Sequence, residues 1–326
     1  MDALALHRDA VVIDGLIISN FSRRVFEDMR KGGLSAANCT CSVWENFRGS
    51  MANVVRWKRW FREHADLILE VRTTTDILRA KREGKVGIIL GWQNTSGIED
   101  RIGYLQVFKE LGVHVMQLTY NTQNLSGSGC YESHDSGLSD FGRDVVAEMN
   151  RLGILCDLSH VGPRTSEDVI RHSNKPVAFT HCCPAGLKAH PRNKSDELLK
   201  LIAEHGGFVG VTMFPWFLRR GNDSTIEDYV EAIEYVVDVA GEDHTGFGTD
   251  FTQDQGPDFF DYLSRDKGHG RLVVRGSDPV FPAGFRTIGE TPNLTVAMDH
   301  RGWPEPRIRK VMGENWLRFY KEVWGA

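Results

Sequence analysis

The sequence predicts an α/β fold and, within that class, a TIM-type (β/α)8 barrel. Eight short apolar runs follow one another along the 326 residues, and segments with helical periodicity separate them. No Gly-rich phosphate loop follows the first run, which disfavours the alternative of an open doubly wound sheet. Neither an internal repeat nor a shift in composition divides the chain. We therefore expect one barrel domain over residues 1–326, with helices at its C-terminal end.

The predicted strands are apolar, β-prone runs that are too short to be helices. In chain order they lie at residues 10–15, 36–43, 86–91, 113–118, 154–158, 177–180, 208–213 and 245–250. The predicted helices carry their apolar residues three and four positions apart, on one face. They lie at residues 23–30, 51–69, 102–111, 139–152, 166–172, 197–205 and 226–240, and the chain from residue 292 onward is largely helical.

The composition is that of a globular protein able to bury a large core, with 41% hydrophobic and 25% charged residues. A formal net charge of −5 argues against nucleic acid as a main partner. No run of about eighteen apolar residues is present, and residues 1–9 lack the apolar centre of a signal peptide. We expect a cytoplasmic protein that acts on a small molecule, with no membrane or nucleic-acid partner.

The six cysteines form neither a CxxC pair nor a zinc-finger pattern. Cys39, Cys41 and Cys156 lie in predicted strands, where a free cysteine behaves as a small buried hydrophobe. Cys182 and Cys183 follow a predicted strand and could line a pocket, but no nucleophile signature surrounds them. The sequence therefore gives little support to a catalytic cysteine.

Polar side chains end several predicted strands, and in a barrel these C-terminal ends converge on the face that carries the site. His160 and His181 end two similar apolar runs, and Asp250 ends the eighth. Equivalent positions on other strands hold Asp14, Gln93 and Tyr120. Two imidazoles and a carboxylate suit zinc or a similar divalent ion, and the carboxylate could move a proton. Either histidine alone could be an ordinary hydrogen-bonded residue, but three polar residues at matching strand ends favour a site.

Arg192 follows the sixth predicted strand, within His190-Pro191-Arg192-Asn193, and is expected on the same rim. A guanidinium there could bind a substrate carboxylate through two parallel hydrogen bonds. An ordinary surface arginine is an equally good interpretation of this stretch.

Seven segments carry a resemblance to a known family. They are residues 137–143 (GLSDFGR), 149–153 (MNRLG), 157–161 (DLSHV), 180–181 (TH), 191–193 (PRN), 246–251 (GFGTDF) and 313–318 (GENWLR). In this order, over almost the whole chain, the sequence resembles the renal (membrane) dipeptidase family of zinc metallopeptidases. The resemblance implies an amidohydrolase-like (β/α)8 barrel, commonly a homodimer, that hydrolyses dipeptides at a two-zinc site.

The resemblance assigns roles to four residues of this sequence. His160 and His181 match the two histidines that bind the family's second zinc ion. Asp250 matches an aspartate near the nucleophilic water, proposed to handle its proton. Arg192 matches the arginine that binds the carboxylate of the dipeptide.

Other positions depart from the family's pattern. The His-x-Asp pair that binds the first zinc is replaced by Leu16 and Ile18, and the glutamate that bridges the two ions by Gln93. Because apolar side chains cannot bind a metal and a neutral amide is a poor zinc ligand, we predict that the first site is absent and one ion is bound. Tyr120 replaces the histidine that polarises the substrate carbonyl, and could donate a hydrogen bond to an oxyanion.

Two hypotheses remain open. In the first, the protein is a hydrolase that cleaves a dipeptide or a related amide with a free carboxylate, using one zinc ion. In the second, it is a metal-free barrel that binds a small carboxylate or catalyses other chemistry. The polar residues at the strand ends favour the first hypothesis, and the apolar Leu16 and Ile18 favour the second.

Overall fold

The computed structural model describes residues 2–274 and 276–325. Its strands run parallel in one sheet, in the order β1-β2-β4-β5-β6-β7-β8-β9, and β3 pairs with β4 beside this path. The strands are β1 (Ile13–Ile17), β2 (Ala36–Ser42), β3 (Ile68–Glu70), β4 (Val86–Trp92), β5 (Val113–Gln117), β6 (Leu155–Asp157), β7 (Ala178–Cys182), β8 (Phe208–Val211) and β9 (Thr245–Phe247). Beyond β9, Phe251 forms a parallel bridge to Ile17 of β1, so the sheet curves round into a barrel.

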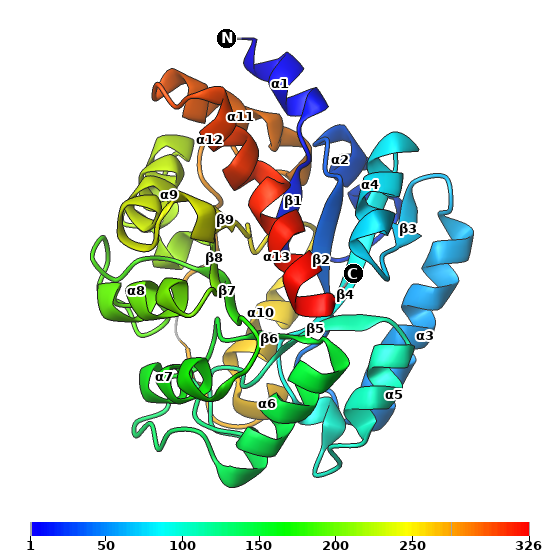
Figure 1. The fold of residues 1–326 in the computed structure, drawn as a ribbon, viewed down its shortest axis with the longest axis vertical. Coiled ribbons are helices and arrows are strands. Elements are labelled where there is room, and N and C mark those ends of the chain that lie inside the picture. Colours follow the sequence, from blue (N-terminus) through cyan, green and yellow to red (C-terminus); the bar gives the residue numbers. More distant parts are fainter. Residues whose placement is uncertain (1, 275, 326) are drawn as a thin grey trace.

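Helices surround the sheet (Figure 1). They are α1 (Ala3–Asp9), α2 (Arg23–Lys31), α3 (Phe47–Glu63), α4 (Thr74–Arg82), α5 (Tyr104–Glu110), α6 (Asp140–Leu152), α7 (Pro163–His172), α8 (Asp196–Glu204), α9 (Ile226–Ala240), α10 (Pro257–Ser264), α11 (Pro292–His300), α12 (Glu305–Arg309) and α13 (Asn315–Trp324). Four of them begin after a Ser or Asn whose side chain accepts a hydrogen bond from the backbone N–H three residues on: Ser22, Asn46, Ser139 and Ser195. These caps explain where the helices start.

The hydrophobic core has two parts. The larger lies between the strands and the outer helices. The smaller fills the barrel itself, where Ile13 and Ile89 meet Trp316 of α13. Trp316 donates from Nε1 to the carbonyl oxygen of Phe247 at 2.9 Å, and a Cβ on Gly15 would lie 2.6 Å from its ring. Because α13 fills this end of the barrel, the C-terminal ends of the strands are left for polar residues.

The predicted (β/α)8 fold is confirmed. Helices α1, α4 and α10 were not predicted, and two predicted elements have other bounds. The helix expected at residues 51–69 is α3, which ends at Glu63, and the residues expected to finish it form β3. Ile68 and Glu70 pair with β4, and these backbone bonds replace those that a longer helix would have made. The first strand begins at Ile13 and passes through Gly15, so Asp14 lies inside the strand instead of at its end.

None of the described helices is long and apolar enough to cross a membrane. All six cysteines are buried with free thiols. Burial raises the pKa of every one of these thiols, so each keeps its proton at neutral pH and is a poor nucleophile.

Candidate metal centre

Two histidines meet at the C-terminal end of the barrel. His160 follows β6 by three residues, and His181 lies in the neighbouring strand β7. Both side chains are buried, and their Nε2 atoms lie 3.1 Å apart. The structure thus brings together the two histidines that the sequence singled out.

The other nitrogen of each ring contacts a hydrogen-bond acceptor. His160 Nδ1 lies 2.7 Å from Asn121 Oδ1, an oxygen that can only accept. His181 Nδ1 lies 2.8 Å from Thr180 Oγ1, and the proton of that hydroxyl is donated to Asp157 Oδ2 at 2.8 Å. Each Nδ1 therefore carries a proton, and the lone pairs of the two Nε2 atoms face each other. Two facing lone pairs repel unless a cation lies between them, so the pair is suited to binding one.

The surroundings keep both imidazoles neutral. Burial lowers the pKa of His160 and of His181 well below its usual value, and the charges of Arg192 and Lys194 lower it further. A neutral imidazole is the form that binds a metal ion, so the rings are in the ligand form at neutral pH.

Asp157 fixes the two chain ends that carry the histidines. Its carboxylate accepts hydrogen bonds from the backbone N–H groups of Ser159 and Thr180, each at 3.0 Å, and from the hydroxyl groups of the same two residues. Burial raises the pKa of Asp157, and these hydrogen bonds act in the opposite direction. The carboxylate links β6 to β7 and, through Thr180, orients the ring of His181.

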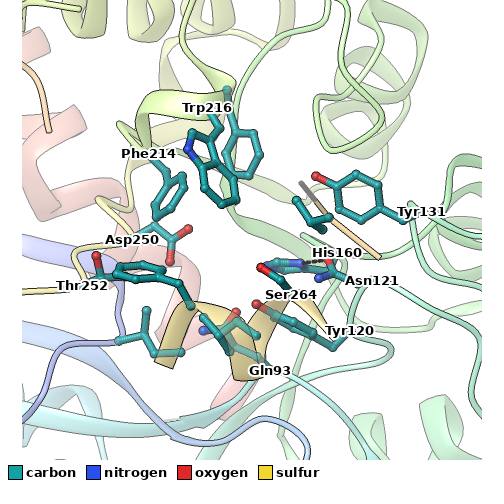
Figure 2. A pocket seen from close by; sticks show the side chains of 15 residues that line it. Gln93, Tyr120, Asn121, Tyr131, His160, Phe214, Trp216, Asp250, Thr252 and Ser264 are labelled. Atoms are coloured by element: carbon teal, nitrogen blue, oxygen red, sulfur yellow. Dashed lines mark hydrogen bonds between the residues drawn. The ribbon is translucent and has the colours of Figure 1, made fainter. Parts of the chain in front are cut away.

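A pocket with a cavity volume of about 50 Å³ opens beside His160 (Figure 2). Its lining residues follow the C-terminal ends of β1, β4, β5, β6, β8 and β9, or belong to α10 and the segment after it. Gln93, Tyr120, His160 and Asp250 all line it, which places four of the polar strand-end residues in one cavity.

Asp250 lies across the pocket from His160 (Figure 2). Asp250 is 7% exposed, and its carboxylate opens onto the pocket. Burial raises its pKa to about 7, against the opposing effect of the charge on Arg192. The backbone φ angles of Asp250 and of Asn121 are 60° and 61°, in the left-handed region that residues other than glycine rarely adopt. Such strain is concentrated at functional sites, and here two strained residues share one pocket.

Tyr120 lies flat against His160, with ring centroids 4.1 Å apart and 25° between the ring planes. Trp44 meets Tyr120 edge-on, at 5.1 Å. Burial, and after it the negative charge of Asp250, raises the pKa of Tyr120 well above its usual value. The phenol therefore keeps its proton and can donate a hydrogen bond into the pocket.

The side of the barrel mouth that β1 and β4 form is apolar or neutral. Leu16 and Ile18 are buried, and Gln93 donates from Nε2 to Thr40 Oγ1 at 2.9 Å. Within residues 2–274 and 276–325, no three His, Cys, Asp or Glu side chains are grouped so that they could hold a metal ion. The histidine pair is therefore the strongest donor set at this end of the barrel.

Arg192 is fully buried and is not among the residues that line the pocket. Its terminal nitrogens donate to the carbonyl oxygens of Ser159 and His181. Lys194, two residues further on, is also buried and donates from Nζ to the carbonyl oxygen of Val161 at 2.8 Å. The sequence placed Arg192 on the rim, whereas the structure places it against the chain ends that carry the histidines, because backbone carbonyls there take up its donors.

Comparison with known proteins identifies the family. The family model for membrane dipeptidases, peptidase family M19, matches residues 19–267. The chain belongs to this family. The resemblance seen in the sequence is thereby confirmed.

Solved structures of related proteins agree with the fold of this membrane dipeptidase family member. An amidohydrolase from Pseudomonas aeruginosa is 58% identical, with 100% of each chain covered and a TM-score of 0.99. A metallopeptidase from Rhodobacter sphaeroides, liganded with a phosphinate mimic of the dipeptide L-Ala-D-Ala, is 22% identical over 97% of this chain and 100% of its own, with a TM-score of 0.80. The probable dipeptidase PvdM from Pseudomonas aeruginosa is 20% identical over 99% and 97%, with a TM-score of 0.83. At these identities the last two show the shared fold.

Three residues of the centre were not found from the sequence: Asn121, Asp157 and Thr180. A signal for two of them was present, because Asp157 and Thr180 each shortly precede a histidine at a strand end. The hydrogen bonds between Asp157 and Thr180 depend on the pairing of β6 with β7. This pairing cannot be deduced from the sequence.

Proposed function

We propose that the protein is a metal-dependent hydrolase that cleaves a dipeptide, or a related amide with a free carboxylate, using one zinc ion. The observation that supports this proposal is the His160–His181 pair, whose Nε2 atoms lie 3.1 Å apart. Membership of a dipeptidase family supports the reaction class. The homodimer that the family resemblance implies is part of the same proposal.

The donor set fits a single zinc ion. Zinc binds imidazole nitrogen at about 2.0–2.1 Å, so two nitrogens on one tetrahedral ion lie about 3.3 Å apart. His160 and His181 come close to that separation, and their Nδ1 partners hold the rings in the required tautomer. Two protein ligands are one fewer than the usual three of a catalytic zinc site, and they leave two tetrahedral positions for water and substrate. Leu16, Ile18 and Gln93 do not fit a second ion.

A zinc ion bound here would supply Lewis acidity, polarising a carbonyl and acidifying water. Asp250, with its pKa raised to about 7, is poised to accept a proton from a nucleophile and to return it to a leaving amine. Tyr120 retains its proton and would donate a hydrogen bond to the developing oxyanion. Arg192 would attract the substrate carboxylate by its charge, since its terminal nitrogens already donate to carbonyl oxygens.

The alternative function is a metal-free barrel that binds a small carboxylate or catalyses other chemistry. Its support is the apolar character of Leu16 and Ile18, together with the lack of a three-ligand cluster among the described residues. This alternative leaves the facing lone pairs of the two histidines without a role.

Metal analysis and a dipeptide-hydrolysis assay on the same protein samples separate the two functions. We expect about one zinc ion per chain after equilibration with zinc, and loss of both the ion and dipeptide hydrolysis in His160→Ala and His181→Ala. His172→Ala, an exposed histidine on α7, is the matched control and should retain both. Protein that binds no ion, and variants of the pair with unchanged activity, would rule out the proposal.

A further inference from the structure

The pocket beside His160 has two chemically different halves. One half holds His160, Asn121 and Tyr120. The other holds Asp250, with Phe214 and Trp216 next to it (Figure 2). A substrate that places its scissile bond near His160 therefore extends another part of itself into the half around Asp250.

Asp250 gives this pocket its charge. Among the described lining residues it is the single Asp or Glu, and none is a Lys or Arg. His160 is held neutral, and Arg192 lies outside the lining. A carboxylate in a largely apolar pocket is poorly solvated, and a cationic ligand would offset that cost. The negative charge of Asp250 thus favours a cation in this half, away from the histidine pair.

Aromatic side chains form much of the remaining wall. Six line the pocket: Tyr120, Tyr131, Phe214, Trp216, Phe217 and Phe260. Three of them lie close together in the turn after β8, where the ring of Phe214 is 5.2 Å from that of Trp216 and 5.3 Å from that of Phe217. Aromatic faces attract cations that cannot donate hydrogen bonds, and quaternary ammonium groups are recognised in this way.

We propose that the half of the pocket around Asp250 binds a methylated ammonium group of the substrate, with the aromatic side chains around it and Asp250 as its countercharge. The inference rests on the proposed function and narrows its substrate to an amide or dipeptide with an N-methylated amino end. A primary ammonium would need several acceptors, whereas a methylated one is satisfied by aromatic surface and a single carboxylate. The bound cation favours the ionised form of Asp250, which is the form that accepts a proton.

Binding of three small probes to the full chain tests the proposal by calorimetry. Choline carries a trimethylammonium group, 3,3-dimethylbutan-1-ol is its neutral isostere, and ethanolamine carries a primary ammonium. We expect choline to bind at least about tenfold more tightly than either of the others. Equal binding of the neutral isostere would mean that the pocket is merely apolar, and tighter binding of ethanolamine would mean that it selects hydrogen-bond donors. Either result overturns the proposal.

Substitutions then locate the binding. Trp216→Leu and Phe214→Leu keep an apolar wall but remove the aromatic faces, and Asp250→Asn removes the charge; each should weaken choline binding by about five- to tenfold. Phe61→Leu on α3, a half-buried aromatic residue outside this pocket, is the matched control and should bind choline like the parent protein. Melting temperatures check that the variants fold, and the probe series on the parent protein stays decisive if one of them does not. Unchanged choline binding in all three folded variants would contradict the proposal.

The choline-binding test and the hydrolase assay can fail independently, because binding of the probes requires neither a metal ion nor turnover. If dipeptides with a primary amine are hydrolysed while choline does not bind, this inference fails and the hydrolase assignment stands. If choline binds selectively but no amide is cleaved, the cation site stands and the hydrolase assignment fails. Where both hold, trimethylglycyl amides should be cleaved with a kcat/KM about tenfold above that of 3,3-dimethylbutanoyl amides of the same amino acid.

Discussion

Two sides of the barrel mouth are built from equivalent strand ends and have opposite chemistry. On the side of β6 and β7, His160 and His181 face each other with neutral rings. On the side of β1 and β4, Leu16 and Ile18 are apolar, and the amide of Gln93 bonds to Thr40. Under the proposed function, the first side binds the metal ion and the second binds none.

The scaffolding under the two sides is nevertheless the same. Asp14 of β1 accepts hydrogen bonds from the backbone N–H and the hydroxyl of Thr249, and from the N–H of Leu16 two residues on. Asp157 of β6 makes the equivalent bonds with Thr180 and with the N–H of Ser159. A buried aspartate thus ties neighbouring strands on both sides, whether or not ligands follow. The difference between the sides lies in the side chains at the mouth, and the strand links are independent of metal chemistry.

The largest expected effect is on kcat/KM, and it is tested with one substitution on each side of the barrel mouth. His181→Ala removes a ligand and should lower kcat/KM for a cleaved dipeptide by more than about a hundredfold. Ile18→Val shortens a pocket-lining side chain without removing a donor, and should change kcat/KM by less than about threefold. Steady-state kinetics on the two purified variants measures both. A similar loss in both would show that the two sides do not differ in function.

Exchanging the two buried aspartates for asparagine sharpens the comparison. Asparagine cannot accept every bond that the carboxylate accepts, so Asp14→Asn and Asp157→Asn should each lower the free energy of unfolding by about 1–3 kcal/mol. Only Asp157 orients a metal ligand, so zinc affinity should fall by about 10- to 100-fold in Asp157→Asn and stay unchanged in Asp14→Asn. Denaturant titration and competition with a zinc chelator give the two quantities. Equal zinc affinities in the two variants would refute the distinction.

The smallest effect is a pH dependence of kcat/KM that arises from Asp250. The backbone N–H of this residue donates to the carbonyl oxygen of Leu16, on the apolar side. Its pKa is raised to about 7 by burial, and the ionised form is the one that accepts a proton. As pH falls below about 7 the carboxyl becomes protonated, so kcat/KM should fall by about tenfold per pH unit. Arg192→Met removes a positive charge that opposes the rise in the pKa of Asp250. The fall in kcat/KM should therefore begin at a higher pH in this variant. A pH profile without an inflection in this range would exclude Asp250 as the base.

The sequence was sufficient for the barrel because each strand is a short apolar run followed by a helical segment. It was insufficient for β3, whose three residues continue the apolar pattern of α3 and are set apart only by pairing with β4. The sequence also did not predict that α13 fills one end of the barrel. Its Trp316 donates to the carbonyl oxygen of Phe247, 69 residues earlier in the chain.

The candidate site was predictable to the same degree. Strand-end position was enough to single out His160 and His181, which the structure brings together. It did not show that Arg192 is buried, because a short segment after a strand does not reveal which way its side chains turn. The link from Asp157 to Thr180 depends on strand register, and the aromatic side chains around Asp250 come from a turn and a helix that no motif marked.

The most direct test of the central claim is anomalous diffraction at the zinc edge from crystals of the zinc-equilibrated protein. We predict one anomalous peak per chain, between Nε2 of His160 and Nε2 of His181, and none beside Leu16, Ile18 and Gln93. A second peak on the β1 and β4 side, or no peak at the histidine pair, would contradict it.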